Sequence, residues 1–160
     1  MKLKENETIP NSEFFIMEDG NPIKKNTFEF FKNKKVVLFG LPGAYTSVCS
    51  AKHLPGYVDS HDKYQAKGVD LIVCISVNDP FVMGAWGRDL KVGKKVRMFG
   101  DGSAEFTKKL GMEFDLTARG FGVRSQRYVM IVDNGIVKHL AVEGPGKFEV
   151  SDAASALKHL

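Results

Sequence analysis

Residues 34–50, KKVVLFGLPGAYTSVCS, decide the fold, because a buried strand passes here into a helix that begins beside a cysteine. The run at 34–40 is apolar on both faces, which predicts a strand at the centre of a sheet, and Leu41-Pro42-Gly43 breaks it. From about Ser47 apolar side chains recur every three to four residues, which predicts a helix that Pro55-Gly56 kinks or splits. Cys49 then lies in the first helical turn, where unpaired N–H groups and partial positive charge stabilise a thiolate.

Strand and helix patterns alternate through most of the remaining chain. Alternating units imply parallel strands early in the chain, and a late hairpin adds antiparallel ones. The sequence therefore predicts the α/β class, with a mixed central sheet, helices on both faces and an N-terminal β-hairpin extension; the thioredoxin-like fold is one such arrangement. The expected elements are a hairpin at 14–25, strands at 69–76 and 96–100, a helix from Asp79-Pro80, a short helix from Ser103 to Gly111, a loop at 112–126, a hairpin at 128–142 turning at Asn134-Gly135, and a final helix within 151–160.

The length and charge of the chain exclude several classes of protein. With 160 residues and no linker, one domain spanning 1–160 is expected. The net charge is +4, but the lysine clusters are not interleaved with aromatic side chains, so we expect no nucleic-acid partner. No apolar stretch predicts an export signal or a membrane span, so a cytoplasmic location without membrane contact is expected. Two cysteines and four histidines show no metal-ligand spacing, and we expect neither a metal nor a cofactor.

The residues around Cys49 form the pattern Pro-x-x-x-Thr-x-x-Cys, which a buried structural cysteine does not need. This pattern resembles the active-site signature of the peroxiredoxins. LPGAYTSVCSAKHLPGY (41–57) is similar to the peroxiredoxin 5 (type II, atypical) subfamily in particular. CISVNDPFVMGAW (74–86) and RSQRYVMIVDNGIVK (124–138) are also similar to it, in the same order along the chain.

The resemblance implies a thioredoxin-like fold and the reduction of hydrogen peroxide and organic hydroperoxides by a cysteine thiolate. Cys49 takes the position of the nucleophile, which becomes a sulfenic acid, and Pro42 and Thr46 take the other motif positions. The Thr46 hydroxyl is expected to donate to the thiolate or to bind a substrate oxygen. Arg127 takes the place of the active-site arginine, with Arg124 as the alternative. His53 either orients hydrogen bonds near Cys49 or packs within the helix.

The resemblance leaves open how the sulfenic acid is reduced. The region GKFEVSDAA (146–154), where many members of the subfamily carry a resolving cysteine, has none. Cys74 is the other thiol, and type II plant relatives use a cysteine at a similar spacing. It lies within IVCISV (72–77), however, where an inert core thiol is also expected. We therefore favour an external thiol, glutathione or a glutaredoxin before thioredoxin, over a two-cysteine mechanism with Cys74, and we expect a homodimer.

Two other functions are the alternatives to a peroxidase. A thiol-disulfide oxidoreductase normally needs Cys-x-x-Cys, and here Lys52 stands three residues after Cys49, which argues against it. A non-enzymatic redox sensor or binding module would keep an oxidisable Cys49 without rapid turnover.

Overall fold

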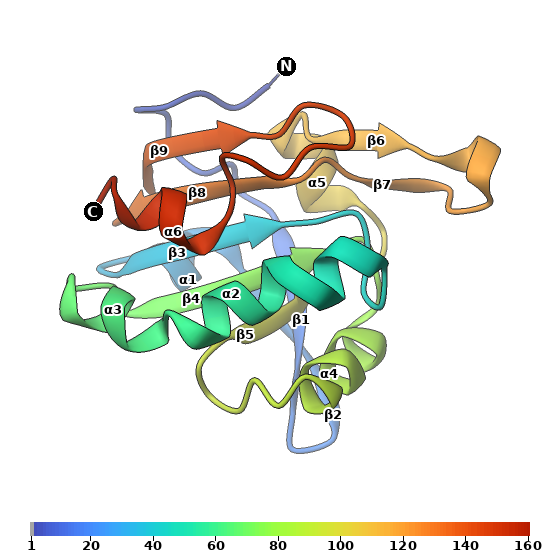
Figure 1. The fold of residues 1–160 in the computed structure, drawn as a ribbon, viewed down its shortest axis with the longest axis horizontal. Coiled ribbons are helices and arrows are strands. Elements are labelled where there is room, and N and C mark those ends of the chain that lie inside the picture. The colour runs from blue at the N-terminus through green and yellow to red at the C-terminus, as the bar shows by residue number, and fades with distance from the viewer. Residues whose placement is uncertain (1) are drawn as a thin grey trace.

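A seven-stranded mixed sheet forms the centre of the computed structural model, which describes residues 2–160 (Figure 1). The strands lie in the order β2-β1-β5-β4-β3-β8-β9. Their bounds are β1 Glu13–Glu18, β2 Asn21–Asn26, β3 Lys35–Gly40, β4 Leu71–Ser76, β5 Arg97–Gly100, β8 Tyr128–Asp133 and β9 Ile136–Val142.

The three central strands run parallel, and antiparallel strands flank them on both sides. β3 pairs with β4 and β4 with β5 in parallel, whereas β8 pairs antiparallel with β3 and β1 with β5. Almost every residue of β3 and β4 is buried, as parallel strands covered on both faces require. The predicted strands and both predicted hairpins are confirmed, and Asn134 and Gly135 adopt the positive φ angles expected at the second hairpin turn.

Helices cover both faces of the sheet, as predicted. Four helices pack on one face, where Tyr57, Tyr64 and Trp86 belong to one core cluster with β3 and β4 side chains. These are α2 (Leu54–Asp59), α3 (His61–Ala66), α4 (Pro80–Asp89) and α6 (Ala153–Leu157). On the other face α1 (Thr27–Phe31) and α5 (Glu105–Leu110) bury Phe31 and Phe106 in a second cluster.

The predicted interruption of the helix after Cys49 falls one turn earlier than expected. Pro55 and Gly56 lie inside α2, where Pro55 occupies one of the first positions. The irregularity is a π-helical turn, η1 (Cys49–His53), in which the Leu54 N–H donates to the Cys49 carbonyl. The prediction of a kink or split at Pro55-Gly56 was therefore wrong in its place.

Two local predictions differ from the structure, and one short helix was not predicted. Ser103 does not cap the next helix, because the Asp101 carboxylate accepts from the N–H groups of Phe106 (3.2 Å) and Thr107 (2.8 Å) instead. Residues 112–126 are not a simple loop: β6 (Glu113–Asp115) and β7 (Val123–Ser125) form a two-stranded ribbon joined through the 3₁₀ turn η2 (Thr117–Arg119). The short helix α1 was not predicted at all. Within residues 2–160, no helix is long and apolar enough to cross a membrane.

Candidate active site

The residues singled out by the sequence meet at the carboxyl ends of β3 and β4. The loop after β3 is tied to the loop after β4 by Asn78, whose side-chain oxygen accepts from the Ala44 N–H (3.0 Å) and from the Ser76 hydroxyl (2.7 Å). This edge of a parallel sheet is where α/β folds place their sites. The short loop 41–46 therefore fixes the position of the helix start, and with it Cys49, at this edge of the sheet.

Cys49 is fully buried, and its sulfur has one charged neighbour. The Arg127 Nη2 donates to Cys49 Sγ over 3.2 Å. Arg127 directly precedes β8, and β8 is the antiparallel neighbour of the strand that leads to the cysteine. Two segments 78 residues apart in sequence are thereby brought into contact. A guanidinium in this position stabilises negative charge on the sulfur.

His53 holds the guanidinium from its other side. Arg127 Nη1 lies 2.9 Å from His53 Nδ1, and His53 Nε2 lies 3.1 Å from the Ser151 carbonyl oxygen. Since arginine can only donate and a carbonyl can only accept, His53 carries its proton on Nε2 and accepts at Nδ1. Burial, followed by the charge of Arg127, lowers the pKa of His53 from 6.5 to about 3, so the ring is neutral at physiological pH. His53 is thus both packed and hydrogen-bonded, which unites the two predicted roles.

Glu143 fixes the segment that supplies the Ser151 carbonyl. Its carboxylate accepts from the N–H groups of Glu149, Val150 and Ser151 and from the Ser151 hydroxyl, over 2.7–2.9 Å. Burial alone raises the pKa of this carboxyl, but the hydrogen bonds outweigh it and the net shift is downward. The chain of contacts therefore runs from Glu143 through Ser151, His53 and Arg127 to the sulfur of Cys49.

Thr46 and Pro42 lie at the mouth of the site. The Thr46 hydroxyl donates to the Gly43 carbonyl (2.8 Å), so its hydrogen is engaged and its oxygen can accept. Of the two roles expected for Thr46, donation to the thiolate is therefore not seen, and binding of a substrate oxygen stays a prediction. Arg124, the alternative to Arg127, does not contact the sulfur: its Nη1 donates to the Pro42 carbonyl (3.3 Å) and its Nε to the Phe121 carbonyl (2.9 Å).

A pocket of about 320 Å³ opens beside Cys49, and Pro42, Thr46 and Arg127 line it. Most of its other lining side chains are apolar, and they come from the helix start, the β6–β7 ribbon and the segment 143–148. Phe148 also packs on the guanidinium of Arg127, whose central carbon lies 5.8 Å from the ring centroid. A small reactant in this pocket can reach the residues that surround the sulfur.

Cys74 lies in the core beneath the site. It is fully buried in β4, opposite Phe39 of β3, and both cysteines are free thiols. Burial, followed by the charge of Cys49, raises the pKa of Cys74 well above its usual value, so this thiol is protonated. No cluster of three or more His, Cys, Asp or Glu side chains within residues 2–160 could hold a metal ion.

Sequence reasoning missed three residues that position the site: Asn78, Glu143 and Ser151. Asn78 follows a predicted strand, where a polar side chain often reaches a neighbouring loop, and this was the one usable signal. Glu143 and Ser151 flank a turn rich in glycine and proline, and nothing in their spacing indicates that they contact each other or support His53.

A thioredoxin-like sheet that places a cysteine against an arginine at its carboxyl edge defines a class of thiol-dependent redox proteins. The sequence model of the Redoxin family matches residues 4–157. Together with the relatives described next, this match shows that the chain belongs to the Redoxin family and, within it, to the peroxiredoxins, which are thiol peroxidases. Its class is thus an enzyme rather than a non-enzymatic sensor.

Three relatives illustrate the similarity. Peroxiredoxin-2B of Arabidopsis thaliana is 41% identical over 155 residues, which cover 96% of each chain. The crystal structure of reduced Prx3 from Vibrio vulnificus in complex with H₂O₂ is 47% identical, covers 98% of both chains and superimposes with a TM-score of 0.94. The crystal structure of peroxiredoxin 5 from Alvinella pompejana is 30% identical, with a TM-score of 0.87 over 98% of this chain and 97% of that one.

Proposed function

We propose that Cys49 reacts as a thiolate with the terminal oxygen of hydrogen peroxide or an organic hydroperoxide. A sulfur–oxygen bond forms, the O–O bond breaks, and its electron pair leaves with the distal oxygen, which takes up a proton and departs as water or an alcohol. Cys49 is oxidised to a sulfenic acid and the peroxide is reduced. The observation that carries this proposal is the 3.2 Å contact between Arg127 Nη2 and Cys49 Sγ beside an open pocket.

The surrounding groups suit the charge that develops during this reaction. The Arg127 guanidinium stays charged at any working pH and can donate to the peroxide oxygens as negative charge moves onto the leaving one. The Thr46 oxygen, whose own hydrogen is engaged by Gly43, can accept the peroxide O–H and so orient it. A bound H₂O₂ in the V. vulnificus relative supports hydrogen peroxide as one substrate.

Single-turnover oxidation of the reduced protein tests the assignment of the nucleophile. Trp86, the one tryptophan of the chain, donates from its indole N–H to the hydroxyl of Ser50 (2.9 Å), next to Cys49, and its fluorescence can report oxidation of the sulfur. We expect Cys49→Ser to abolish the fluorescence change and the consumption of peroxide, and Cys74→Ser to retain both. Normal turnover by Cys49→Ser would refute the proposal.

We propose that an external thiol reduces the Cys49 sulfenic acid back to the thiolate, and we favour glutathione or a glutaredoxin over thioredoxin. Two observations support this: Cys74 is fully buried in a central strand, and the pocket beside Cys49 carries Arg119 and Lys147, which attract an acidic thiol such as glutathione. Intact mass after one equivalent of peroxide distinguishes the two routes. A gain of oxygen, or an adduct after glutathione is added, supports the external route. A loss of two hydrogens that Cys74→Ser prevents identifies Cys74 as the resolving thiol.

A homodimer that uses loops near the site is also part of the proposal. Its support is the exposure of Tyr45 (52%) and Phe81 (59%), two large side chains that lie at α4 beside the Cys49 loop. Light scattering of the wild type and of Phe81→Glu tests it: we expect a dimer that the charged side chain weakens. A monomeric wild type would contradict this part alone.

A further inference from the structure

We propose that the pocket beside Cys49 prefers hydroperoxides that carry a carboxylate on an apolar tail, such as fatty-acid hydroperoxides, over their uncharged counterparts. This inference rests on the proposed reaction of Cys49 with hydroperoxides. It adds a selection by charge, and it assigns that selection to Arg119 and Lys147.

The size of the pocket exceeds what hydrogen peroxide needs. Its volume is about 320 Å³, whereas a cavity needs only about 10–15 Å³ on the same measure to hold one water molecule. Pockets of roughly 300 Å³ and more accommodate organic ligands. The peroxide end of such a ligand belongs beside Thr46 and Arg127, so the rest of the pocket is left for a tail.

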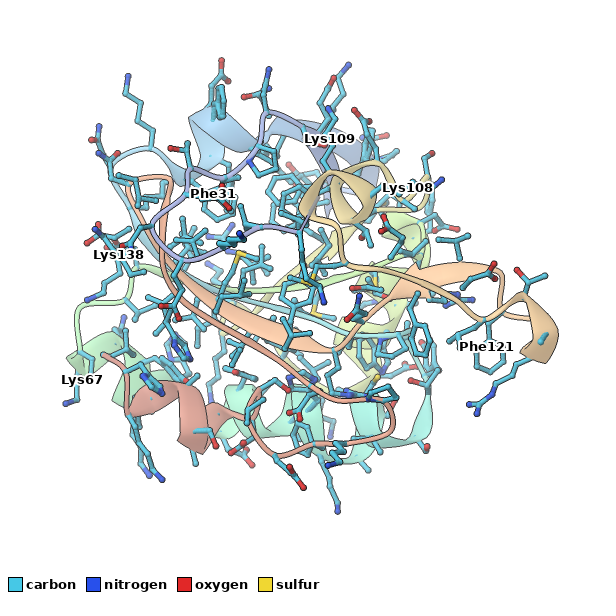
Figure 2. The ribbon with its side chains drawn as sticks, turned by 90° about the horizontal axis from the view of Figure 1, so that it is seen from above. Phe31, Lys67, Lys108, Lys109, Phe121 and Lys138 are labelled. Atoms are coloured by element: carbon cyan, nitrogen blue, oxygen red, sulfur yellow. The ribbon has the colours of Figure 1, made fainter. Side chains whose placement is uncertain are left out.

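The walls of the pocket suit an apolar tail. Besides Pro42, six apolar side chains line it, contributed by three separate segments: Val48, Phe114, Leu116, Phe121, Pro145 and Phe148. Phe121 is 44% exposed and lies at the outer end of the β6–β7 ribbon, which projects beyond the rest of the molecule (Figure 2). A tail laid along these walls covers apolar surface that water otherwise wets, which contributes about 25 cal/mol for each Å² buried.

The charges of the pocket suit an anion at the end of that tail. Three cations, Arg119, Arg127 and Lys147, line it, against one carboxylate, Glu143. Arg127 is engaged by Cys49 and His53, and Glu143 is engaged by the N–H groups of residues 149–151. Within residues 2–160, neither Arg119 nor Lys147 has a carboxylate at salt-bridge distance. These two cations can therefore attract the carboxylate of a ligand.

The experiment compares a fatty-acid hydroperoxide with its methyl ester, which has the same tail and no charge. Reduced enzyme is mixed with each below the concentration at which micelles form, and the rate constant of the Trp86 fluorescence change is measured in single turnover. No reductant takes part in this measurement, so an effect on glutathione binding cannot mimic the result. Hydrogen peroxide is measured alongside with the wild type.

We expect the acid to react about tenfold faster than the ester at low salt, and this ratio to shrink as salt screens the charges. In the double variant Arg119→Gln/Lys147→Gln the ratio should fall to near one. The matched control is Lys138→Gln, an exposed lysine of β9 at the end of the molecule away from Phe121 (Figure 2), which should keep the ratio of the wild type.

A ratio near one in the wild type, or a ratio that the double variant leaves unchanged, would overturn the inference. Failure of the inference and of the proposed function are distinguishable. If the wild type reacts with hydrogen peroxide but reacts equally fast with the acid and its ester, the inference alone is contradicted. If the wild type reacts with no peroxide, the proposed function is contradicted.

Discussion

At the scale of single residues, the contact between Arg127 and Cys49 depends on a neutral histidine. His53 Nδ1 accepts a hydrogen bond from the guanidinium, and His53 Nε2 donates one to the Ser151 carbonyl, so both ring nitrogens have a partner. A protonated ring would present a second cation to Arg127 and would lose the acceptor. The pKa of about 3, set first by burial, keeps the arrangement intact across the physiological range.

Removing the guanidinium should slow the peroxide step more than removing its neighbour in sequence. For Arg127→Ala we expect a loss of about 10²–10³-fold in single-turnover rate, because a donor aimed at the developing charge is lost. Arg124→Ala, which loses only contacts to the Pro42 and Phe121 carbonyls, should lose roughly tenfold or less. The reverse order would mean that Arg124 reaches the substrate.

Acid should destabilise the wild type through His53. The unfolded chain binds a proton at this ring near pH 6.5, whereas the folded state does so only near pH 3, so the free energy of unfolding falls as pH falls between these values. From pH 6.5 to 5 the wild type should lose about 2 kcal/mol relative to His53→Gln in urea unfolding, at about 1.4 kcal/mol per pH unit.

Tyr57→Phe is the matched control for this prediction. It removes the other buried donor to the Ser151 carbonyl, a 2.7 Å bond from a hydroxyl that does not titrate in this range. Its deficit in unfolding free energy should therefore be the same at both pH values. Equal pH slopes for the wild type and His53→Gln would show that the histidine is not held neutral.

At the scale of elements, two irregular segments position the site residues, and residues just beyond the ends of regular strands hold both segments in place. The loop 41–46 is held by Asn78 from the next strand, and the turn 149–151 is held by the carboxylate of Glu143 at the end of β9. The backbone of the loop 41–46 bonds to the sheet only at its start, where the Leu41 N–H donates to the Ile75 carbonyl (3.3 Å). Polar side chains from neighbouring elements therefore do much to fix the shape of both segments.

Glu143→Gln should weaken the turn that supports His53. A neutral amide accepts these N–H groups less strongly and turns its own N–H toward them, so we expect a loss of about 2–3 kcal/mol in unfolding free energy at pH 7. The folded pKa of Glu143 is lowered below 4.5. The stabilisation is thus fully present above about pH 4.5 and is lost as pH falls through the folded pKa.

Urea unfolding of both proteins from pH 7 down into the acid range measures this. The difference in unfolding free energy between the wild type and Glu143→Gln should be constant at neutral pH and should become smaller only in acid. A difference that does not change with pH would assign the loss to packing rather than to the charge.

At the scale of the whole molecule, the sequence could predict what depends on long apolar patterns and on strong turn residues. The central strands, the Asn134-Gly135 hairpin and the α4 cap at Asp79 follow from local patterns, and all form. The three-residue strands β6 and β7 and the five-residue helix α1 are too short for any periodicity. They exist because of their packing: Phe31 of α1, for example, is buried against Phe14.

Some residues of the candidate site could likewise be predicted from local patterns, and others could not. Pro42, Thr46 and Cys49 lie within eight residues and share one motif, and the family resemblance added Arg127. Glu143 and Ser151 act on His53 across about 90 residues or more of sequence, and such a contact leaves no local pattern. The same holds for Asp101, which caps α5 from outside the expected position.

Close backbone approach links the end of the central strand β5 to the site. A Cβ on Gly100 of β5 would lie 2.7 Å from the Asn78 carbonyl oxygen and 2.8 Å from the Pro80 nitrogen, and backbone cannot easily yield. We expect Gly100→Ala to cost about 1–3 kcal/mol and to slow the peroxide step, because Asn78 holds the Cys49 loop.

Thermal unfolding and single-turnover rates check this prediction. The control is Gly56→Ala in α2, where the new methyl group would lie 3.8 Å from the Ala153 Cβ and a helical alanine should add about 0.5–1 kcal/mol. If Gly100→Ala keeps wild-type stability and rate, the loops after β4 and β3 are less tightly coupled than the contacts imply.

The wide turn at Cys49–His53 also sets the direction in which the sulfur leaves the helix axis. Its hydrogen bond from Leu54 spans five residues, one more than an α-turn, while Leu54 and Tyr57 keep α2 anchored in the core. Each residue of a helix advances by about 100° around its axis. Loss of one residue from this turn would thus swing the nucleophile away from its guanidinium while leaving α2 seated. Point substitutions here alter chemistry or packing, whereas a change in length alters orientation.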